Sequence, residues 1–229
     1  YRCLMKACVY PDGWWNEGSP TYHYYPLRAM LLSAGALRCR GIDLFDGKLF
    51  RMFASPAQGT YADLVFPAHN DGWHGESLTA QVRLYELGYA HYRDPLLLDV
   101  LKRCYREVPR NSYEALLNPD GAAFGGAAAL PGSLVFGDLG VGILRSGRRT
   151  VVLKYGPYGG GHGHPDKLSV SVHDGRREIL PDLGTSAYGV PAFRGWYRRT
   201  LAHNTVTVDG ADQRPVAGAL KTFRAAASG

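Results

Sequence analysis

The stretch GGGHGHPDKLSVSVHDGRREILPD, residues 159–182, joins a glycine-rich turn to two short runs that read as strands. The runs 168–173 and 178–181 are separated by Asp174-Gly175, a strong signal for a hairpin turn. This spacing predicts two adjacent antiparallel strands. In extended backbone, residues two apart face the same side, so His162 and His164 are expected to point into one cleft.

Similar strand signals continue on both sides of this stretch. Short, often β-branched runs bounded by Gly or Asp-Gly turns predict strands at 139–144, 150–155 and 205–209. We therefore expect residues 134–229 to form an antiparallel sheet or sandwich that is incomplete at its carboxyl end.

The first half of the chain has the pattern of helices instead. Apolar residues at helical spacing predict helices over 20–41, 44–54 and 76–92, and a fourth after Asp94-Pro95. Successive amphipathic helices indicate a helical toroid or bundle over residues 1–117. Residues 118–133 are rich in Gly, Ala and Pro and are predicted to be a linker. The fold class is therefore α+β with more than one domain.

Composition limits the possible partners. The 229 residues carry a formal charge of +6 with both signs interspersed, which mildly favours a polyanionic partner. The sequence contains no recognisable nucleic-acid-binding motif. No apolar run is long enough to cross a membrane. The four cysteines are read as small buried apolar residues. Because the chain starts at Tyr1 without a methionine, we expect it to be an internal piece of a longer protein. Its cellular location stays open. Its oligomeric state also stays open, with a homodimer as one option.

Three side chains from separate motifs can supply metal ligands. His164 lies in the glycine-rich turn, Asp182 ends the run Leu180-Pro-Asp, and His203 precedes the last predicted strand. Two imidazole nitrogens and one carboxylate oxygen suit zinc, with a position left for water or a fourth group. The bland alternative for the glycine-rich stretch is a turn that carries surface histidines.

These motifs resemble those of a known family. The series His162-Gly-His164-x-Asp-Lys-Leu-Ser, Leu-Pro-Asp182-x-Gly-Thr and Trp196-Tyr-Arg-x-Thr-x-Ala-His203-Asn-Thr closely resembles the heparinase II/III-like polysaccharide lyases, which include alginate, oligoalginate, heparin and heparan sulfate lyases. The dense part of the match covers about residues 139–215. Upstream, Trp14-Trp-Asn-Glu17-Gly-Ser-Pro-Thr-Tyr22 resembles the segment with the family's catalytic tyrosine, and the segment from Phe66 to Trp73 is similar to a loop of the oligoalginate lyase branch.

The resemblance implies β-elimination at a uronate, which leaves a 4,5-unsaturated sugar. It assigns proton transfer to Tyr22, places His162 in the cleft as base or as a carboxylate-facing group, and makes His164, Asp182 and His203 ligands of a structural zinc beside the active site. It also implies an (α/α) toroid followed by a β-sandwich. The family's further histidine or asparagine, which neutralises the substrate carboxylate, lies tens of residues before the tyrosine. Either a longer parent protein supplies that group, or this piece is inactive by itself.

Several assignments stay open at this level. Tyr24 and Tyr25 are rivals of Tyr22, and His23 is read as a structural neighbour. Residues that can bind an acidic polysaccharide or oligosaccharide, the expected partner, are Tyr188, Arg194, Arg198, Arg199, Asn70 and Glu17. The leading hypothesis is an alginate or oligoalginate lyase. The alternatives are a heparin or heparan sulfate lyase and a non-catalytic, zinc-containing carbohydrate-binding protein.

Overall fold

The computed structural model describes residues 1–119, 124 and 128–225. The α-helices are α1 (Arg2–Cys8), α2 (Pro20–Arg38), α3 (Gly47–Gly59), α4 (Val82–Tyr92) and α5 (Pro95–Cys104). The strands are β1 (Leu134–Phe136), β2 (Val141–Ser146), β3 (Arg149–Lys154), β4 (Ser169–His173) and β5 (Glu178–Leu180). Short helical turns are η1 (Leu78–Gln81), η2 (Tyr113–Leu117), η4 (Gly160–His162), η5 (Phe193–Tyr197) and η6 (Thr200–Ala202).

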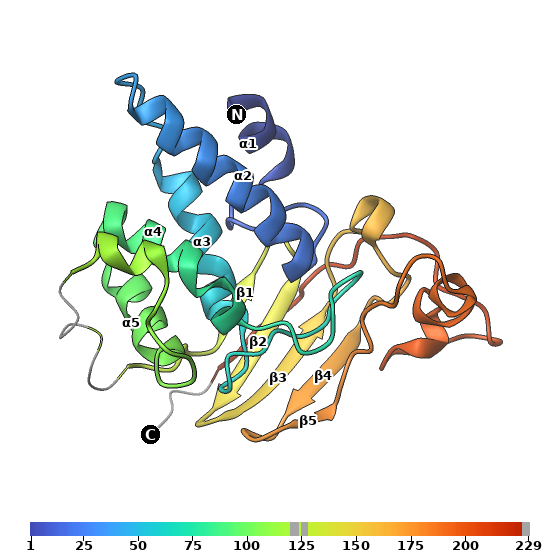
Figure 1. Ribbon diagram of the computed structural model, residues 1–229. Coiled ribbons are helices and arrows are strands. Elements are labelled where there is room, and N and C mark those ends of the chain that lie inside the picture. Colours follow the sequence, from blue (N-terminus) through green and yellow to red (C-terminus); the bar gives the residue numbers. More distant parts are fainter. Residues whose placement is uncertain (120–123, 125–127, 226–229) are drawn as a thin grey trace.

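The helices form one layer and the five strands form another, with the segment after β5 on the far side of the sheet from α5 (Figure 1). A large apolar core fills the helical layer and includes Leu27, Phe53 and Tyr85. A smaller apolar cluster joins the layers, where the ring of Trp14 packs edge-on against that of Phe136 with 5.7 Å between centroids. The N-terminal end of α2 is thereby held beside the sheet.

Helix boundaries follow their capping residues. α2 confirms the predicted helix that begins at Pro20 and ends three residues before Gly41. α3 starts at 47 rather than 44 because the Asp46 side chain accepts hydrogen bonds from the backbone N–H groups of the first turn. The predicted helix 76–92 divides into η1 and α4. α1 was not predicted from the sequence.

The strands form one antiparallel sheet in the order β1-β2-β3-β4-β5. β2, β3, β4 and β5 confirm the predicted strands to within about two residues at each end. The prediction of a strand at 205–209 is wrong, since this segment has only an isolated bridge between Val208 and Ala211. It begins beside β4, where the Val170 N–H donates to the Asn204 carbonyl at 3.1 Å, but it does not continue as a strand. The predicted linker 118–133 falls partly on 120–123 and 125–127, outside the described residues.

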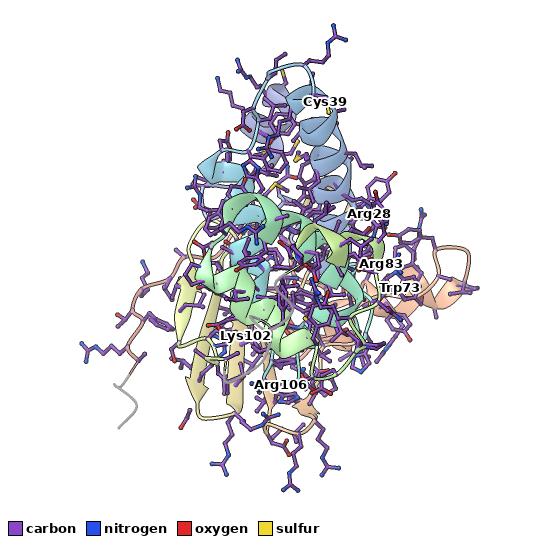
Figure 2. The ribbon with its side chains drawn as sticks, turned by 60° about the vertical axis from the view of Figure 1, so that its left-hand side comes forward. Arg28, Cys39, Trp73, Arg83, Lys102 and Arg106 are labelled. Atoms are coloured by element: carbon purple, nitrogen blue, oxygen red, sulfur yellow. The ribbon has the colours of Figure 1, made fainter. Side chains whose placement is uncertain are left out.

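The outer face of the helical layer is basic. The side chains of Arg28, Arg83, Lys102 and Arg106 project from α2, α4, α5 and the turn after it (Figure 2).

No helix in the described part of the chain has the length and hydropathy of a bilayer span. Cys104 is buried as expected, whereas Cys3 and Cys39 are exposed, so the reading of all four cysteines as buried is wrong.

His23 joins α2 to α3 inside the protein. Pro56 lies within α3 and has no N–H to donate to the Met52 carbonyl four residues earlier. The Nε2 of His23 lies 2.7 Å from that carbonyl oxygen, and its Nδ1 accepts the Trp15 N–H at 3.1 Å. The imidazole is fully buried, and both nitrogens are engaged in its neutral form. His23 is therefore the structural neighbour of Tyr22 that the sequence indicated.

Burial makes His23 a pH-sensitive element of stability. It lowers the pKa of His23 from 6.5 to about 4, so the unfolded chain binds this proton more tightly than the folded one. The stabilisation is fully present above pH 6.5 and is lost as the pH falls toward 4. We expect His23 to account for a loss of about 3 kcal/mol in the free energy of unfolding between pH 7 and pH 4.

Urea unfolding of the wild type and His23→Gln at pH 7 and pH 4 measures this loss. The variant is expected to be less stable at pH 7 but to lose less stability on acidification. Equal losses in the two proteins would assign the effect to other groups.

Candidate functional site

Two predicted catalytic residues meet where α2 approaches η4. Tyr22 lies in the first turn of α2, and its ring stacks on the imidazole of His162 with 3.7 Å between centroids. The hydroxyl of Tyr22 makes a short contact with the hydroxyl of Tyr188, which lies 3.3 Å from the Nδ1 of His162. Three groups that can transfer or share protons therefore converge from distant parts of the chain.

A buried carboxylate lies beneath this cluster. Asp71, in the loop between α3 and η1, is only 1% exposed. One of its oxygens, Oδ2, lies 2.8 Å from the Nδ1 of His162, and the other, Oδ1, lies 2.8 Å from the Nε2 of His164. Thr185 and Tyr188 also donate to it, each at 3.3 Å. Asp71 thus contacts both histidines of the glycine-rich turn.

Glycines allow these loops to approach closely. A Cβ on Gly159 would lie 2.4 Å from the Glu17 carbonyl oxygen, so a side chain there would push the turn away from the start of α2. Gly184 has φ +61°, and a Cβ there would lie 2.1 Å from the Gly72 carbonyl oxygen. Both positions require glycine to close the site around Asp71.

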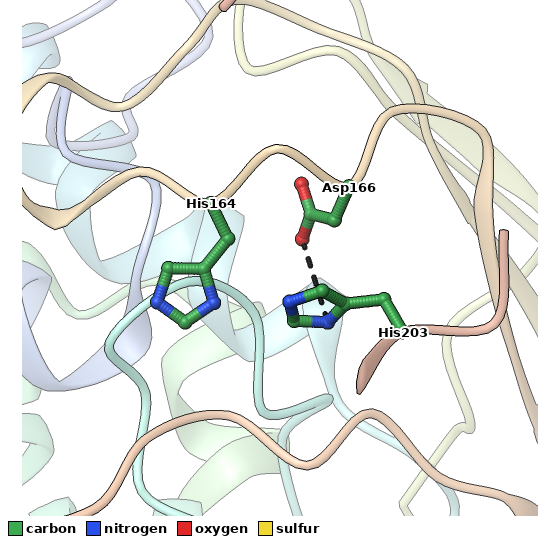
Figure 3. A group of neighbouring side chains, drawn as sticks. All are labelled: His164, Asp166 and His203. Carbon is green, nitrogen blue, oxygen red and sulfur yellow. Dashed lines mark ion pairs between the residues drawn. The ribbon is translucent and has the colours of Figure 1, made fainter. Parts of the chain in front are cut away.

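A second cluster lies just inside the first. His164, Asp166 and His203 each offer a ligand atom, and these atoms lie within 4.8 Å of one another (Figure 3). All three residues are buried. Asp182 is not in this group of three but adjoins it, with its Oδ1 3.1 Å from the Nδ1 of His203. The three predicted metal-ligating residues therefore lie side by side, and Asp166 joins them.

Each residue of this cluster has one polar atom without a protein partner, and for His203 that atom is Nε2. Nδ1 of His164, Oδ1 of Asp166 and Oδ2 of Asp182 are buried without a hydrogen bond. A buried polar atom without a partner costs roughly 1–3 kcal/mol. Converging imidazole and carboxylate atoms left open in this way fit a divalent cation, and zinc accepts this set of ligands.

Buried charges balance each other around this cluster. Burial opposes ionisation of Asp166, but the charge of Lys154, whose Nζ lies 2.5 Å away, outweighs it and lowers the pKa of Asp166. Burial likewise opposes ionisation of Asp182, but the hydrogen bond from His203 and its charge lower the pKa of Asp182. Burial and the nearby Lys154 lower the pKa of Lys167 to about 8. The carboxylates of Asp166 and Asp182 are therefore ionised at neutral pH and available to a cation.

The hydrogen bonds around Asp71 favour its charged form. Burial opposes ionisation, but the hydrogen bonds with His164 and His162 outweigh it and lower the pKa of Asp71. Partial burial, the hydrogen bond with Tyr22 and the charge of Asp71 raise the pKa of Tyr188 above its ordinary range. Tyr188 therefore keeps its proton at neutral pH, and its one hydroxyl hydrogen can turn either to Asp71 or to the Tyr22 oxygen.

Two predicted substrate-binding residues, Glu17 and Asn70, lie in loops that border the site. Glu17 is partly exposed, accepts a hydrogen bond from the Trp15 indole, and lies 3.7 Å from the Nε2 of His162. Asn70 is only 2% exposed, and its amide donates to the carbonyls of Glu17 and Gly18. These contacts hold the backbone of the site, and the assignment of Asn70 to substrate binding stays a prediction.

The remaining predicted substrate-binding residues lie after β5. Tyr188 is 52% exposed and reaches the cluster of Tyr22 and His162. Arg198 donates to the Gly163 carbonyl at 2.8 Å and so braces the glycine-rich turn. Arg199 pairs with Asp212 at 2.5 Å, and Arg194 is exposed on η5. Of the three arginines, Arg198 contacts the turn that carries His162.

The sequence did not single out Asp71 or Asp166 as functional. Asp166 lies two residues after His164, within the quoted turn, and that spacing was the available signal. Asp71 follows Asn70 in the loop similar to the oligoalginate lyase branch, but nothing local to that loop indicates two histidine partners more than 90 residues away.

Comparisons with known proteins agree with this geometry. Residues 128–227 match the family described as Heparinase II/III-like, C-terminal. An alginate lyase from Stenotrophomonas maltophilia is 31% identical over 232 residues, and a heparin-sulfate lyase from Pedobacter heparinus is 24% identical over 213 residues. These alignments cover 87% and 90% of this chain. The chain spans about 30% of the length of these curated relatives.

Solved structures show the same fold. A heparinase III structure superposes with a TM-score of 0.76 at 21% identity and covers 99% of this chain and 34% of its own. Heparan sulfate lyase from Pedobacter heparinus superposes with a TM-score of 0.65 at 24% identity, covering 92% of this chain and 32% of its own. Residues 128–227 therefore match the heparinase II/III-like C-terminal family, and most of the chain is similar to proteins named as alginate and heparin-sulfate lyases.

Proposed function

We propose that the protein containing this chain is a polysaccharide lyase that cleaves uronate-containing glycans by β-elimination. The observation that carries the proposal is the contact of Tyr22, His162 and Tyr188 in one partly exposed cluster. Elimination needs a base for the hydrogen at C5 and an acid for the leaving oxygen at C4, both within reach of one sugar ring. A phenol and an imidazole in contact meet this requirement.

The residues have separable tasks in this proposal. Tyr22 and His162 move the protons, and His162 either acts as base or faces the substrate carboxylate, depending on the stereochemistry of the sugar. Tyr188 donates a hydrogen bond to the Tyr22 oxygen when that oxygen carries negative charge. Negative charge also develops on the uronate carboxylate as C5 loses its proton, and hydrogen-bond donors aimed at it stabilise the transition state.

Alginate or oligoalginate is the proposed substrate. The 31% identity to an alginate lyase and 28% identity to an exo-oligoalginate lyase from Saccharophagus degradans support this choice. A heparin or heparan sulfate lyase is the alternative, supported by the relatives named for heparin sulfate and by the formal charge of +6, which suits sulfated chains. We further propose that α1 to α5 belong to an (α/α) toroid and the sheet to a sandwich of the whole protein.

We also propose a zinc ion at the inner cluster, held by His164, His203 and Asp182, with Asp166 beside it. The unpartnered buried atoms of His164, His203 and Asp182 support this assignment, and Asp166 is the carboxylate whose ligand atom lies within 4.8 Å of those of both histidines. Bound zinc would supply positive charge and tie together the turn at 159–166 and the segments that carry Asp182 and His203. The side chain of His162, two residues from His164, would then be held in place by the same turn.

Lyase activity is the first test. The full-length protein is incubated with polymannuronate, polyguluronate and heparan sulfate while the ultraviolet absorbance of the 4,5-unsaturated uronate is followed. We expect product from an alginate polymer, and we expect Tyr22→Phe to lower kcat at least about 100-fold because it removes the proton-transfer group.

Tyr25→Phe is the matched control, since Tyr25 lies on the same helix but is 80% exposed. It is expected to keep wild-type kcat. Product from heparan sulfate alone would favour the alternative substrate. A folded, zinc-loaded protein that binds these glycans but yields no unsaturated product would be the non-catalytic carbohydrate-binding protein instead.

Metal content is the second test. We expect one zinc per chain by elemental analysis, and Asp182→Asn should weaken zinc binding at least about tenfold because it removes a charged ligand. Zinc removal by a chelator should lower Tm, since zinc binds only the folded arrangement of these residues. His74→Ala, at an exposed histidine outside the cluster, should change neither value. Full zinc occupancy in Asp182→Asn would remove Asp182 from the site.

A further inference from the structure

Asp71 is the one carboxylate that contacts both histidines of the glycine-rich turn among the described residues. Its two oxygens are divided between them at equal distances of 2.8 Å, with Oδ2 on His162 and Oδ1 on His164. The side chain is 1% exposed, so water does not compete for these contacts. Thr185 and Tyr188 hold the carboxylate from the other side at 3.3 Å.

This arrangement fixes the tautomer of His164. An ionised Asp71 only accepts hydrogen bonds, so the Nε2 of His164 carries the hydrogen. The Nδ1 of His164 is then left with a lone pair, and this atom is buried and has no protein partner. A carboxylate behind a histidine of this kind orients the ring and increases its basicity toward a metal ion.

The same reasoning applies to His162. Its Nδ1 donates to Asp71, so the ring presents Nε2 as the free nitrogen, 3.7 Å from the Oε1 of Glu17 at the partly exposed side of the site. Stacking of the Tyr22 ring on the imidazole prevents it from turning over. His162 is therefore held with one nitrogen available to a substrate.

We infer that Asp71 is a positioning residue that uses one carboxylate to orient both the metal-binding nitrogen of His164 and the substrate-facing nitrogen of His162. Its effect on turnover rests on the proposed lyase function, whereas its effect on metal binding does not. The two centres are thereby coupled, because a shift of Asp71 toward one histidine weakens its contact with the other.

A second aspartate–histidine pair, formed by Asp63 and His173, has only a structural role and serves as a comparison. The Oδ2 of Asp63 lies 2.9 Å from the Nε2 of His173, and the Nδ1 of His173 accepts the Gly175 N–H at 3.0 Å. Both nitrogens of His173 are thus engaged within the protein. The pair lies on β4 and the loop after α3 and leaves no nitrogen free for a ligand.

The test compares Asp71→Asn with Asp63→Asn in the full-length protein. Asparagine has nearly the shape of aspartate but a single acceptor oxygen, so it cannot accept from both histidines. We expect Asp71→Asn to weaken Zn²⁺ binding to the metal-free protein by about 10 to 100-fold in calorimetric titration, and to lower kcat by a similar factor with little change in KM. Asp63→Asn is expected to keep the wild-type values of zinc affinity and kcat.

The two readouts separate the two claims. Zinc titration is done without substrate, so a wild type that makes no unsaturated product would defeat the lyase proposal while the zinc result still decides the role of Asp71. Equal zinc affinities in the two variants, or a wild type that binds no zinc, would overturn the inference. Loss of zinc affinity without loss of kcat would overturn the part of the inference that concerns His162.

A milder variant covers the case in which Asp71→Asn fails to fold. Thr185→Val keeps the side-chain shape and removes one donor to Oδ1 of Asp71. It should weaken zinc binding by about fivefold, the net effect of one typical hydrogen bond. Unchanged zinc affinity in folded Thr185→Val, with Asp71→Asn unfolded, would count against the inference.

Discussion

The site depends on the way Asn70 joins the two layers. Its amide nitrogen holds the carbonyls of Glu17 and Gly18 just before α2, and its oxygen accepts hydrogen bonds from Lys154 on β3 and from the backbone of His164. One buried side chain therefore fixes the start of a helix, the end of a central strand and the glycine-rich turn together. Asn70 has φ +56°, a conformation that asparagine tolerates better than most residues. Without this junction the phenol of Tyr22 would have no fixed relation to the imidazole beside it.

Much of the fold was predictable because local signals agreed with tertiary packing. α5 begins after Asp94, which caps it, and the hairpin at Asp174-Gly175 lies where the turn residues put it. The failures have equally local causes. The apolar spacing at 44–54 gave a helix but could not show that it continues through Pro56, because the Met52 carbonyl freed by that proline is bound by His23 from another helix. The strand-like run at 205–209 has β-branched residues, yet after the hydrogen bond from Val170 of β4 to Asn204 the segment turns back on itself at the bridge between Val208 and Ala211.

Only those residues of the candidate site that lie in recognisable sequence motifs could be predicted. Tyr22 and His162 were indicated by their motifs, and the structure brings their rings into contact. The predicted metal-ligating residues lie together, but their binding of zinc stays a prediction. Asp71 and the inward turn of Asn70 could not be read from the chain, because each depends on side chains more than 50 residues away and on the burial that those contacts produce. Sequence patterns report which residue types are present, whereas hydrogen-bond partners across loops are decided by packing.

The strand order of the sheet bears on when the site forms. Each strand pairs with the next along the chain, and the connections are short hairpin loops except between β3 and β4, where residues 155–168 include the glycine-rich turn. Tyr22, Asp71, His162 and Tyr188 come from four segments separated by tens of residues, and bringing them together requires closing much longer loops. Loop closure of this kind favours formation of the strand pairs before the reactive surface, so we expect the site to assemble late in folding.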